Sequence, residues 1–229
     1  MNNIYFNKKV FLAISRLFFI SLFLFNQIQT ALAESPLPIS LAQWQEVRTL
    51  TSISSDPDDK HAKLYVFFDP NCPVCAEIFG VKRSQTHQER AIVIKALVSR
   101  QKPIESIFAA MPAANWIPVN HMKAASLGMD ANLLRSANFT SIIDNFKDFD
   151  FEQRIGATAA IAPTAQEQTQ IAKNTLVWKT LGGGTPLFVF QDKQGNYMRF
   201  IGVAPFLQMN QLFDQVKNSK LKPYSISSN

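Results

Sequence analysis

The chain has 229 residues, of which 47% are hydrophobic, a formal net charge of +6 and only two cysteines, Cys72 and Cys75. This length suits one domain with a sizeable core, or one domain that carries a large insertion. No basic run with interleaved aromatic residues is present, so we expect no nucleic-acid partner. The three histidines are scattered, and with one cysteine pair they do not make the four-ligand set of a structural zinc site. We expect no metal and no organic cofactor.

The first 33 residues have the pattern of a secretory signal peptide. Lys8 and Lys9 give a positive start, Leu17–Phe25 is an apolar run, and Ala31 and Ala33 form a small-x-small cleavage site. The run has nine residues, against the ~20 that span a bilayer, which disfavours the alternative of an uncleaved anchor. A lipid-anchored precursor would need a cysteine directly after the site, where the chain has an acid. We predict cleavage after Ala33 and a periplasmic mature protein.

Residues 34–62 are expected to form an N-terminal helix and a loop. Ser40 and Gln43 have the spacing of a capping box, which predicts a helix start. The helix would place Leu41, Trp44 and Val47 on one side. The polar, proline-containing stretch 54–60 is expected to be a loop.

The stretch FFDPNCPVCAEIFG holds both cysteines. Residues 63–68 are apolar and rich in β-favouring side chains, which predicts a buried strand. The run 69–71, Asp-Pro-Asn, ends that strand. Cys72 then stands at the start of a helix that carries Val74, Ile78, Phe79 and Val81. Pro73 suits the first turn, where its missing N–H costs nothing.

Two cysteines three positions apart predict redox chemistry. Cysteines of exported proteins normally form structural disulfides, but a bridge between Cys72 and Cys75 would remove little unfolded-chain entropy. An inert local bridge is the alternative. A thiolate at a helix N-terminus is stabilised by free backbone N–H groups and by the helix dipole. We predict Cys72 as the attacking sulfur, with a moderately depressed pKa, and the more enclosed Cys75 as the resolving sulfur.

The remaining elements indicate an α/β chain. We expect a strand at 91–98 and helical character over 103–181, interrupted by prolines and glycines. Thr164 and Glu167 form a second capping box, and the helix after it places Ile171, Trp178 and Leu181 on one face before Gly182 ends it. Strands at 185–190 and 197–201 flank a turn at 192–196, and a helix at 205–217 follows. A CxxC at the strand-to-helix junction of such a chain is typical of thioredoxin-like redox proteins.

The chain resembles the periplasmic thiol:disulfide interchange proteins DsbG and DsbC over residues 41–218. The stretch from Leu64 to Cys75 is close to the DsbG form of the motif. Other segments fall in register: Gln43-Trp44-Gln45, Leu97-Val98, Lys102-Pro103, and Leu181-Gly182 leading to Gly184-Thr185-Pro186. The resemblance implies a thioredoxin-like catalytic domain at 63–220 and a tail at 221–229. It also implies a helical insertion at 103–181, between the second core strand and a cis-proline hairpin.

The resemblance further implies a substrate-binding site. Pro186 matches the cis-proline that faces the CxxC in thioredoxin-like folds, and Thr185 would offer backbone groups to an extended substrate segment. Gly184 and the two glycines before it would let the backbone approach closely. Pro73 and Val74, between the cysteines, complete the expected set of substrate-binding residues.

Two features depart from the family. Thioredoxins often hold a buried acid six residues before the first cysteine, where this chain has Val66. Asp69 is expected to act as a turn or cap residue instead. DsbC and DsbG also carry an N-terminal dimerisation domain, and residues 34–62 are too short for one. We therefore expect a monomer with weak or no isomerase activity.

These features predict a periplasmic thiol–disulfide oxidoreductase that exchanges disulfides with exported proteins through Cys72 and Cys75. A membrane-bound redox partner of the DsbD or DsbB type would recharge the pair. One alternative keeps the chemistry but changes its direction, to an oxidase or a reductant of sulfenic acids rather than an isomerase. The other alternative is a chaperone or assembly factor that binds unfolded segments in the cis-proline groove.

Overall fold

The computed structural model describes residues 35–58, 63–83, 85, 88–89 and 107–217. The expected signal peptide, the expected strand at 91–98 and the tail at 221–229 lie outside these residues. Residues 34–229 make up one compact unit, to which all the described residues belong.

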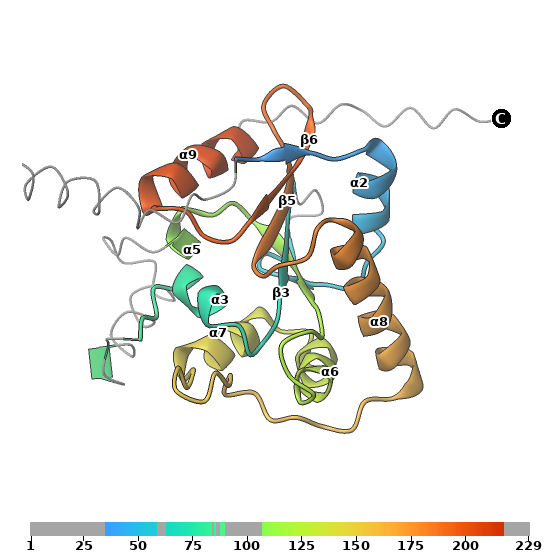
Figure 1. The fold of residues 1–229 in the computed structure, drawn as a ribbon, viewed down its shortest axis with the longest axis vertical. Helices are drawn as coiled ribbons and strands as arrows, with labels where there is room; N and C mark the ends of the chain where they lie inside the picture. Colours follow the sequence, from blue (N-terminus) through green and yellow to red (C-terminus); the bar gives the residue numbers. More distant parts are fainter. Residues whose placement is uncertain (1–34, 59–62, 84, 86–87, 90–106, 218–229) are drawn as a thin grey trace, which may run out of the picture. The chain divides into compact units, whose positions relative to one another are not determined.

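A six-stranded sheet in the order β1-β6-β5-β3-β4-β2 forms the centre of the described fold (Figure 1). Its strands are β1 Leu37–Pro38, β2 Ile53–Ser54, β3 Leu64–Phe68, β4 Ala114–Pro118, β5 Leu187–Gln191 and β6 Tyr197–Ile201. β3 pairs in parallel with β4 and antiparallel with β5. β3 is therefore an interior strand, and all five of its residues are buried. The expected hairpin forms between β5 and β6, where the Asp192 carboxylate accepts from the N–H groups of Gln194 and Asn196.

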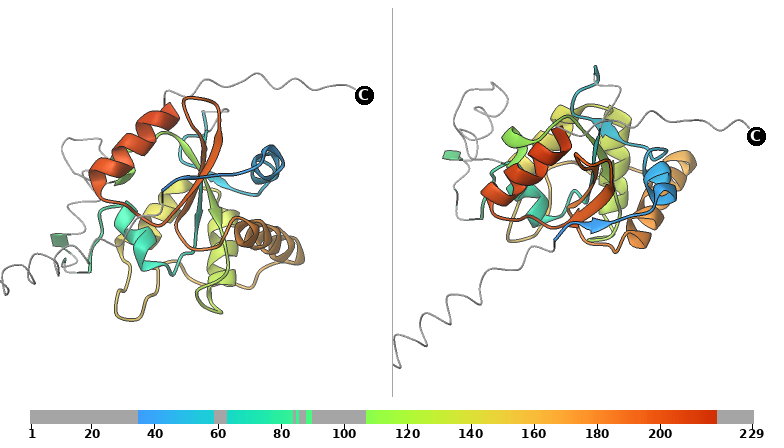
Figure 2. Two further views of the ribbon diagram at one scale, coloured as in Figure 1. Left: turned by 45° about the horizontal axis from the view of Figure 1, so that its top comes forward. Right: turned by 90° about the horizontal axis from the view of Figure 1, so that it is seen from above.

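Helices cover both faces of this sheet. They are α2 Leu41–Val47, α3 Pro73–Ile78, α5 Ile107–Ala110, α6 Ser126–Ser136, α7 Phe139–Lys147, α8 Ala165–Thr180 and α9 Phe206–Lys217. Both expected capping boxes are present, at the start of α2 and of α8. Helices α2 and α8 lie on one face, and α3 and α9 lie on the other (Figures 1 and 2). Among the described residues, no helix has the length and apolarity that crossing a membrane requires.

The strand before the cysteines is anchored in two cores. Successive side chains of a strand point to opposite faces, so Phe67 and Phe68 enter different cores. Phe67 belongs to the cluster that includes Trp44 of α2 and Trp178 of α8. Phe68 packs on the other face with a group of rings built around Phe79, namely Phe108, Trp116, Phe139 and Phe146. The end of β3, from which the cysteine loop departs, is therefore held on both sides.

The expectation of helical character throughout 103–181 is wrong at Ala114–Pro118, where the chain forms β4. This segment pairs with β3 in the register Val66 to Trp116. Trp116 and Ile117 are β-favouring and fully buried, and pairing with β3 outweighs the helical preference of the neighbouring residues. The helical insertion thus consists of α6, α7 and α8, between β4 and β5.

Candidate active site

The first cysteine caps the helix that follows β3, as expected from the sequence. Residues 69–71 form a turn that closes when the Cys72 N–H donates to the Asp69 carbonyl at 2.9 Å. Cys72 has extended backbone angles and is the N-cap of α3, and Pro73 occupies the first turn. The side chain at the cap position points its sulfur at the free N–H groups of the helix start.

The Asp69 carboxylate ties this turn to two other segments. Its Oδ1 accepts from the Asn71 N–H at 2.8 Å and from the Ser126 hydroxyl at 2.9 Å. Its Oδ2 accepts from the N–H groups of His121 and Met122, at 3.0 and 2.9 Å. Asp69 is thus a turn residue, as expected. It also fastens the cysteine turn to the loop after β4 and to the first turn of α6.

The two sulfurs differ in environment. Cys72 is 2% exposed and Cys75 is fully buried, and both thiols are free. The Cys75 N–H lies 3.3 Å from the Cys72 sulfur. The pKa of Cys72 is lowered, first by its hydrogen bond with the Cys75 side chain and then by the Thr185 side chain and backbone N–H groups, while burial opposes them. Burial, and then Cys72, raise the pKa of Cys75 well above its ordinary value. Cys72 is therefore the sulfur that ionises first.

The helix terminus contributes less to the Cys72 pKa than the sequence argument assumed. The backbone N–H groups of Val74 and Cys75 are the smallest of its causes, and the largest is the neighbouring thiol. The direction of the predicted shift agrees, but its main physical source is the second cysteine rather than the helix.

The loop that faces the cysteines contains a cis peptide bond between Thr185 and Pro186, as the family resemblance implies. The Cys72 thiol donates to the Thr185 carbonyl at 3.4 Å. Gly184 has a φ of +90°, and a Cβ there would lie 2.7 Å from a side chain of β6, so the position requires glycine. The Trp178 indole N–H donates to the Gly184 carbonyl at 2.7 Å. The loop is therefore held against both α8 and β6.

Of the expected substrate-binding residues, Thr185 contacts the Cys72 sulfur through its carbonyl. Pro73 and Val74 follow Cys72 in the first turn of α3, and Gly184 and Pro186 flank Thr185 in the facing loop. Pro186 is buried and the other four are half-buried. Their contact with a substrate stays a prediction.

His121 is a site residue that the sequence reading missed. Its Nε2 lies 3.0 Å from the Thr185 hydroxyl oxygen, and its ring stacks on Trp178 with ring centres 4.6 Å apart. It follows the end of β4, and carboxyl ends of parallel neighbouring strands meet at one edge of a sheet. A strand prediction at 114–118 would therefore have placed His121 beside the cysteine turn, which follows the parallel strand β3.

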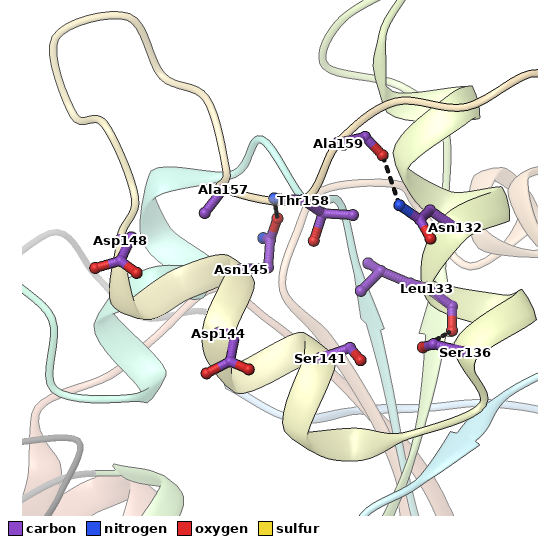
Figure 3. Close-up of a pocket in the computed structure, with 10 residues that line it drawn as sticks. All are labelled: Asn132, Leu133, Ser136, Ser141, Asp144, Asn145, Asp148, Ala157, Thr158 and Ala159. Carbon is purple, nitrogen blue, oxygen red and sulfur yellow. Dashed lines mark hydrogen bonds between the residues drawn. The ribbon is translucent and has the colours of Figure 1, made fainter.

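A pocket of about 280 Å³ lies away from the sulfurs, between α6, α7 and the segment 157–159 (Figure 3). Neither cysteine lines it. One of its lining residues, Asn145, donates to the Pro70 carbonyl at 2.9 Å, so the pocket wall is linked to the turn before Cys72.

Among the described residues, no group of three or more His, Cys, Asp or Glu side chains is arranged to hold a metal ion.

Comparison with known proteins finds similarity in solved structures alone, because no protein-family model and no curated protein matches. A periplasmic thioredoxin-like protein from Salmonella enterica serovar Typhimurium matches with 15% identity and a TM-score of 0.50, over 80% of this chain and 100% of that chain. Proteus mirabilis ScsC matches with 14% identity and a TM-score of 0.49, over 93% and 96%. The thiol-disulfide exchange protein alpha-DsbA2 from Wolbachia pipientis matches with 16% identity and a TM-score of 0.41, over 76% and 91%. The chain has a thioredoxin-like fold. Its helical insertion lies between β4 and the hairpin that follows the cis-proline.

Proposed function

We propose that this protein is a thiol–disulfide oxidoreductase that exchanges disulfides with exported proteins. One observation carries the proposal: Cys72 caps α3 with its sulfur hydrogen-bonded to Cys75 and to Thr185, while Cys75 is fully buried behind it. The arrangement combines a thiol that ionises readily with a second thiol, three residues on, that keeps its proton. That asymmetry suits an attacking sulfur and a resolving sulfur.

The exchange has two steps. The Cys72 thiolate attacks one sulfur of a substrate disulfide, which forms a mixed disulfide and releases the other substrate sulfur as a thiolate that takes up a proton. Cys75 then loses its proton and attacks the Cys72 sulfur, which forms the Cys72–Cys75 bridge and releases the second substrate thiol. The substrate gains two electrons and two protons, and the cysteine pair loses them. The reverse sequence oxidises a substrate dithiol.

We place this reaction in the periplasm. The signal-peptide pattern of residues 1–33 supports export, and the Salmonella protein that shares the fold is itself described as periplasmic. The form of the cysteine motif and the Thr185–Pro186 loop support a DsbG-like or DsbC-like member. A membrane-bound partner of the DsbD or DsbB type would return the pair to its working redox state.

Turnover on a disulfide-bonded protein substrate tests the proposal. With a chemical reductant present, wild-type protein should accelerate the reduction well above the uncatalysed rate, and Cys72→Ala should not. Equal rates for wild type, Cys72→Ala and buffer would overturn it. Equal suppression of substrate aggregation by wild type and Cys72→Ala, without turnover, would instead support the chaperone alternative. The reduction potential of the pair, measured in glutathione buffers, then decides the direction of exchange.

A further inference from the structure

Thr185 contacts two chemically active side chains. On one side, His121 Nε2 is 3.0 Å from the Thr185 hydroxyl oxygen. On the other, the Thr185 carbonyl accepts from the Cys72 thiol at 3.4 Å, and the Thr185 side chain contributes to the lowered pKa of Cys72, after the larger effect of Cys75 and against the effect of burial. Thr185 therefore touches both the imidazole and the sulfur.

Two further contacts hold His121 in place. Its ring stacks on Trp178 at an interplanar angle of 26°. Its backbone N–H donates to the Asp69 carboxylate. Trp178 also holds the loop that carries Thr185, through its hydrogen bond to the Gly184 carbonyl. The ring and the hydroxyl are thus fixed relative to each other by the same tryptophan.

A hydroxyl has one proton to donate, and this decides what the imidazole can do. If Nε2 carries a proton and donates it to the Thr185 oxygen, the hydroxyl proton is free to point at the Cys72 sulfur. If Nε2 is instead the acceptor, the hydroxyl donates its one proton to the ring and cannot donate to the sulfur. Hydrogen bonds to an ionised sulfur favour the ionised form. The thiolate therefore favours the state in which the imidazole donates.

We propose that His121 is a positioning residue that stabilises the Cys72 thiolate through the Thr185 hydroxyl. In the thiolate state, the chain of donors runs from His121 Nε2–H to Thr185 Oγ1, and from Thr185 Oγ1–H to the Cys72 sulfur, in place of the bond that the thiol donates to the Thr185 carbonyl. The one bond broken is the S–H bond of Cys72, whose proton leaves to solvent. The inference deepens the proposed function, on which it rests for its biological meaning, although its test does not depend on turnover.

The imidazole also makes the site pH-sensitive. His121 is exposed at the surface, but partial burial of its ring lowers its pKa, and the Asp69 carboxylate opposes this, so the ring is neutral at neutral pH. When His121 takes up a proton, Nε2 becomes an obligatory donor and adds a positive charge on the far side of Thr185 from Cys72. Protonation of the ring then favours the thiolate, and the thiolate in turn favours protonation of the ring. The two groups titrate as a coupled pair.

Alkylation of the reduced protein by iodoacetamide, followed from pH 4 to 9, tests the proposal. His121→Phe keeps a ring to stack on Trp178 but has no N–H, whereas His121→Gln keeps a donor without the ring. We expect His121→Phe to raise the pH midpoint of Cys72 alkylation by about one unit, which corresponds to about tenfold less thiolate at a pH below the midpoint. His121→Gln should show a smaller shift. Thr185→Val should raise the midpoint similarly, and its effect should not add to that of His121→Phe.

A wild-type midpoint in His121→Phe would overturn the proposal, even if that variant melted at a lower temperature, since a purely structural role moves only the melting temperature. Additive effects of the Thr185 and His121 substitutions would also overturn it, because they would show that the hydroxyl does not mediate. A protein that shows the expected shift but no turnover on disulfide substrates would contradict the proposed function and leave this inference standing.

Discussion

The side-chain amide of Asn145 on α7 donates to the Pro70 carbonyl at 2.9 Å, which joins the helical insertion to the turn before Cys72. The same side chain accepts from the Thr158 N–H at 3.0 Å and is 1% exposed. Gly156 packs so closely against the Asn145 side chain and the Pro70 carbonyl that a Cβ at this position would overlap the Pro70 oxygen. The insertion therefore does more than lengthen the fold, because it supports the peptide that positions the attacking sulfur.

Asn145→Ala should lower the free energy of unfolding by about 1–3 kcal/mol, because it leaves the buried Pro70 carbonyl and the partly buried Thr158 N–H without their partner. Urea unfolding followed by circular dichroism measures this. Asn132→Ala is the matched control, since Asn132 lines the same pocket but makes its hydrogen bond to Ala159 at the exposed surface. A loss of stability as large for Asn132→Ala would contradict the role assigned to the Asn145 link.

Asp130→Asn should stabilise the protein at neutral pH. Asp130 is fully buried on α6, and neither carboxyl oxygen has a hydrogen-bond partner among the described residues. Burial, with the charge of Asp69 adding to it, raises the pKa of Asp130 well above its ordinary value. Above pH ~3.9 the unfolded chain releases this proton while the folded protein keeps it, so wild-type stability falls as pH rises towards the folded pKa.

The asparagine variant lacks this proton and so should lose less stability over the same pH range. Its advantage should be small at pH 4 and grow by up to about 1.4 kcal/mol for each pH unit above that, until the folded pKa is passed. Asp144→Asn, an exposed aspartate on α7, serves as the control and should show no such growth. Denaturant midpoints at pH 4, 5.5 and 7 measure the difference. An advantage that does not change with pH would show that Asp130 is ionised in the folded protein.

Local signals predicted the elements that depend on local chemistry. The capping boxes at Ser40 and Thr164 form as expected because their partners lie three residues away. The Asp-Pro-Asn turn and the proline after Cys72 determine where β3 ends and α3 begins. The hairpin turn follows for the same reason, because the Asp192 carboxylate organises its own turn. In these cases the interacting groups are neighbours in the chain.

Long-range contacts explain what the sequence did not reveal. The segment Ala114–Pro118 is a strand because it pairs with the buried strand β3. No short-range sequence pattern predicts that pairing. The second strand was instead expected at 91–98, which lies outside the described residues. His121 was missed for the same reason, because it follows β4, a strand that the sequence did not reveal. Asp69 lacked a long-range role in the sequence reading because its partners His121 and Ser126 are more than fifty positions away.

Cys75→Ala should raise the pKa of Cys72, although the backbone N–H groups of the helix start stay in place. The hydrogen bond with the Cys75 side chain is the largest cause of the lowered Cys72 pKa, and alanine removes it while keeping the backbone N–H. Thiolate absorbance as a function of pH in reduced protein measures the midpoint. Cys75→Ser retains a donor at this position and should stay closer to wild type. Identical midpoints for Cys75→Ala and wild type would assign the shift to Thr185 and the helix start.

The two cysteines should also differ in their ability to trap partners. If Cys72 attacks and Cys75 resolves, Cys75→Ala forms mixed disulfides with exported proteins and cannot release them by intramolecular attack. Covalent complexes should accumulate and dissolve on addition of reductant, as seen on a non-reducing gel. Cys72→Ala should form few, because Cys75 is fully buried and its pKa is raised. Trapping by Cys72→Ala but not by Cys75→Ala would reverse the roles of the sulfurs, and trapping by neither would favour a binding function without exchange.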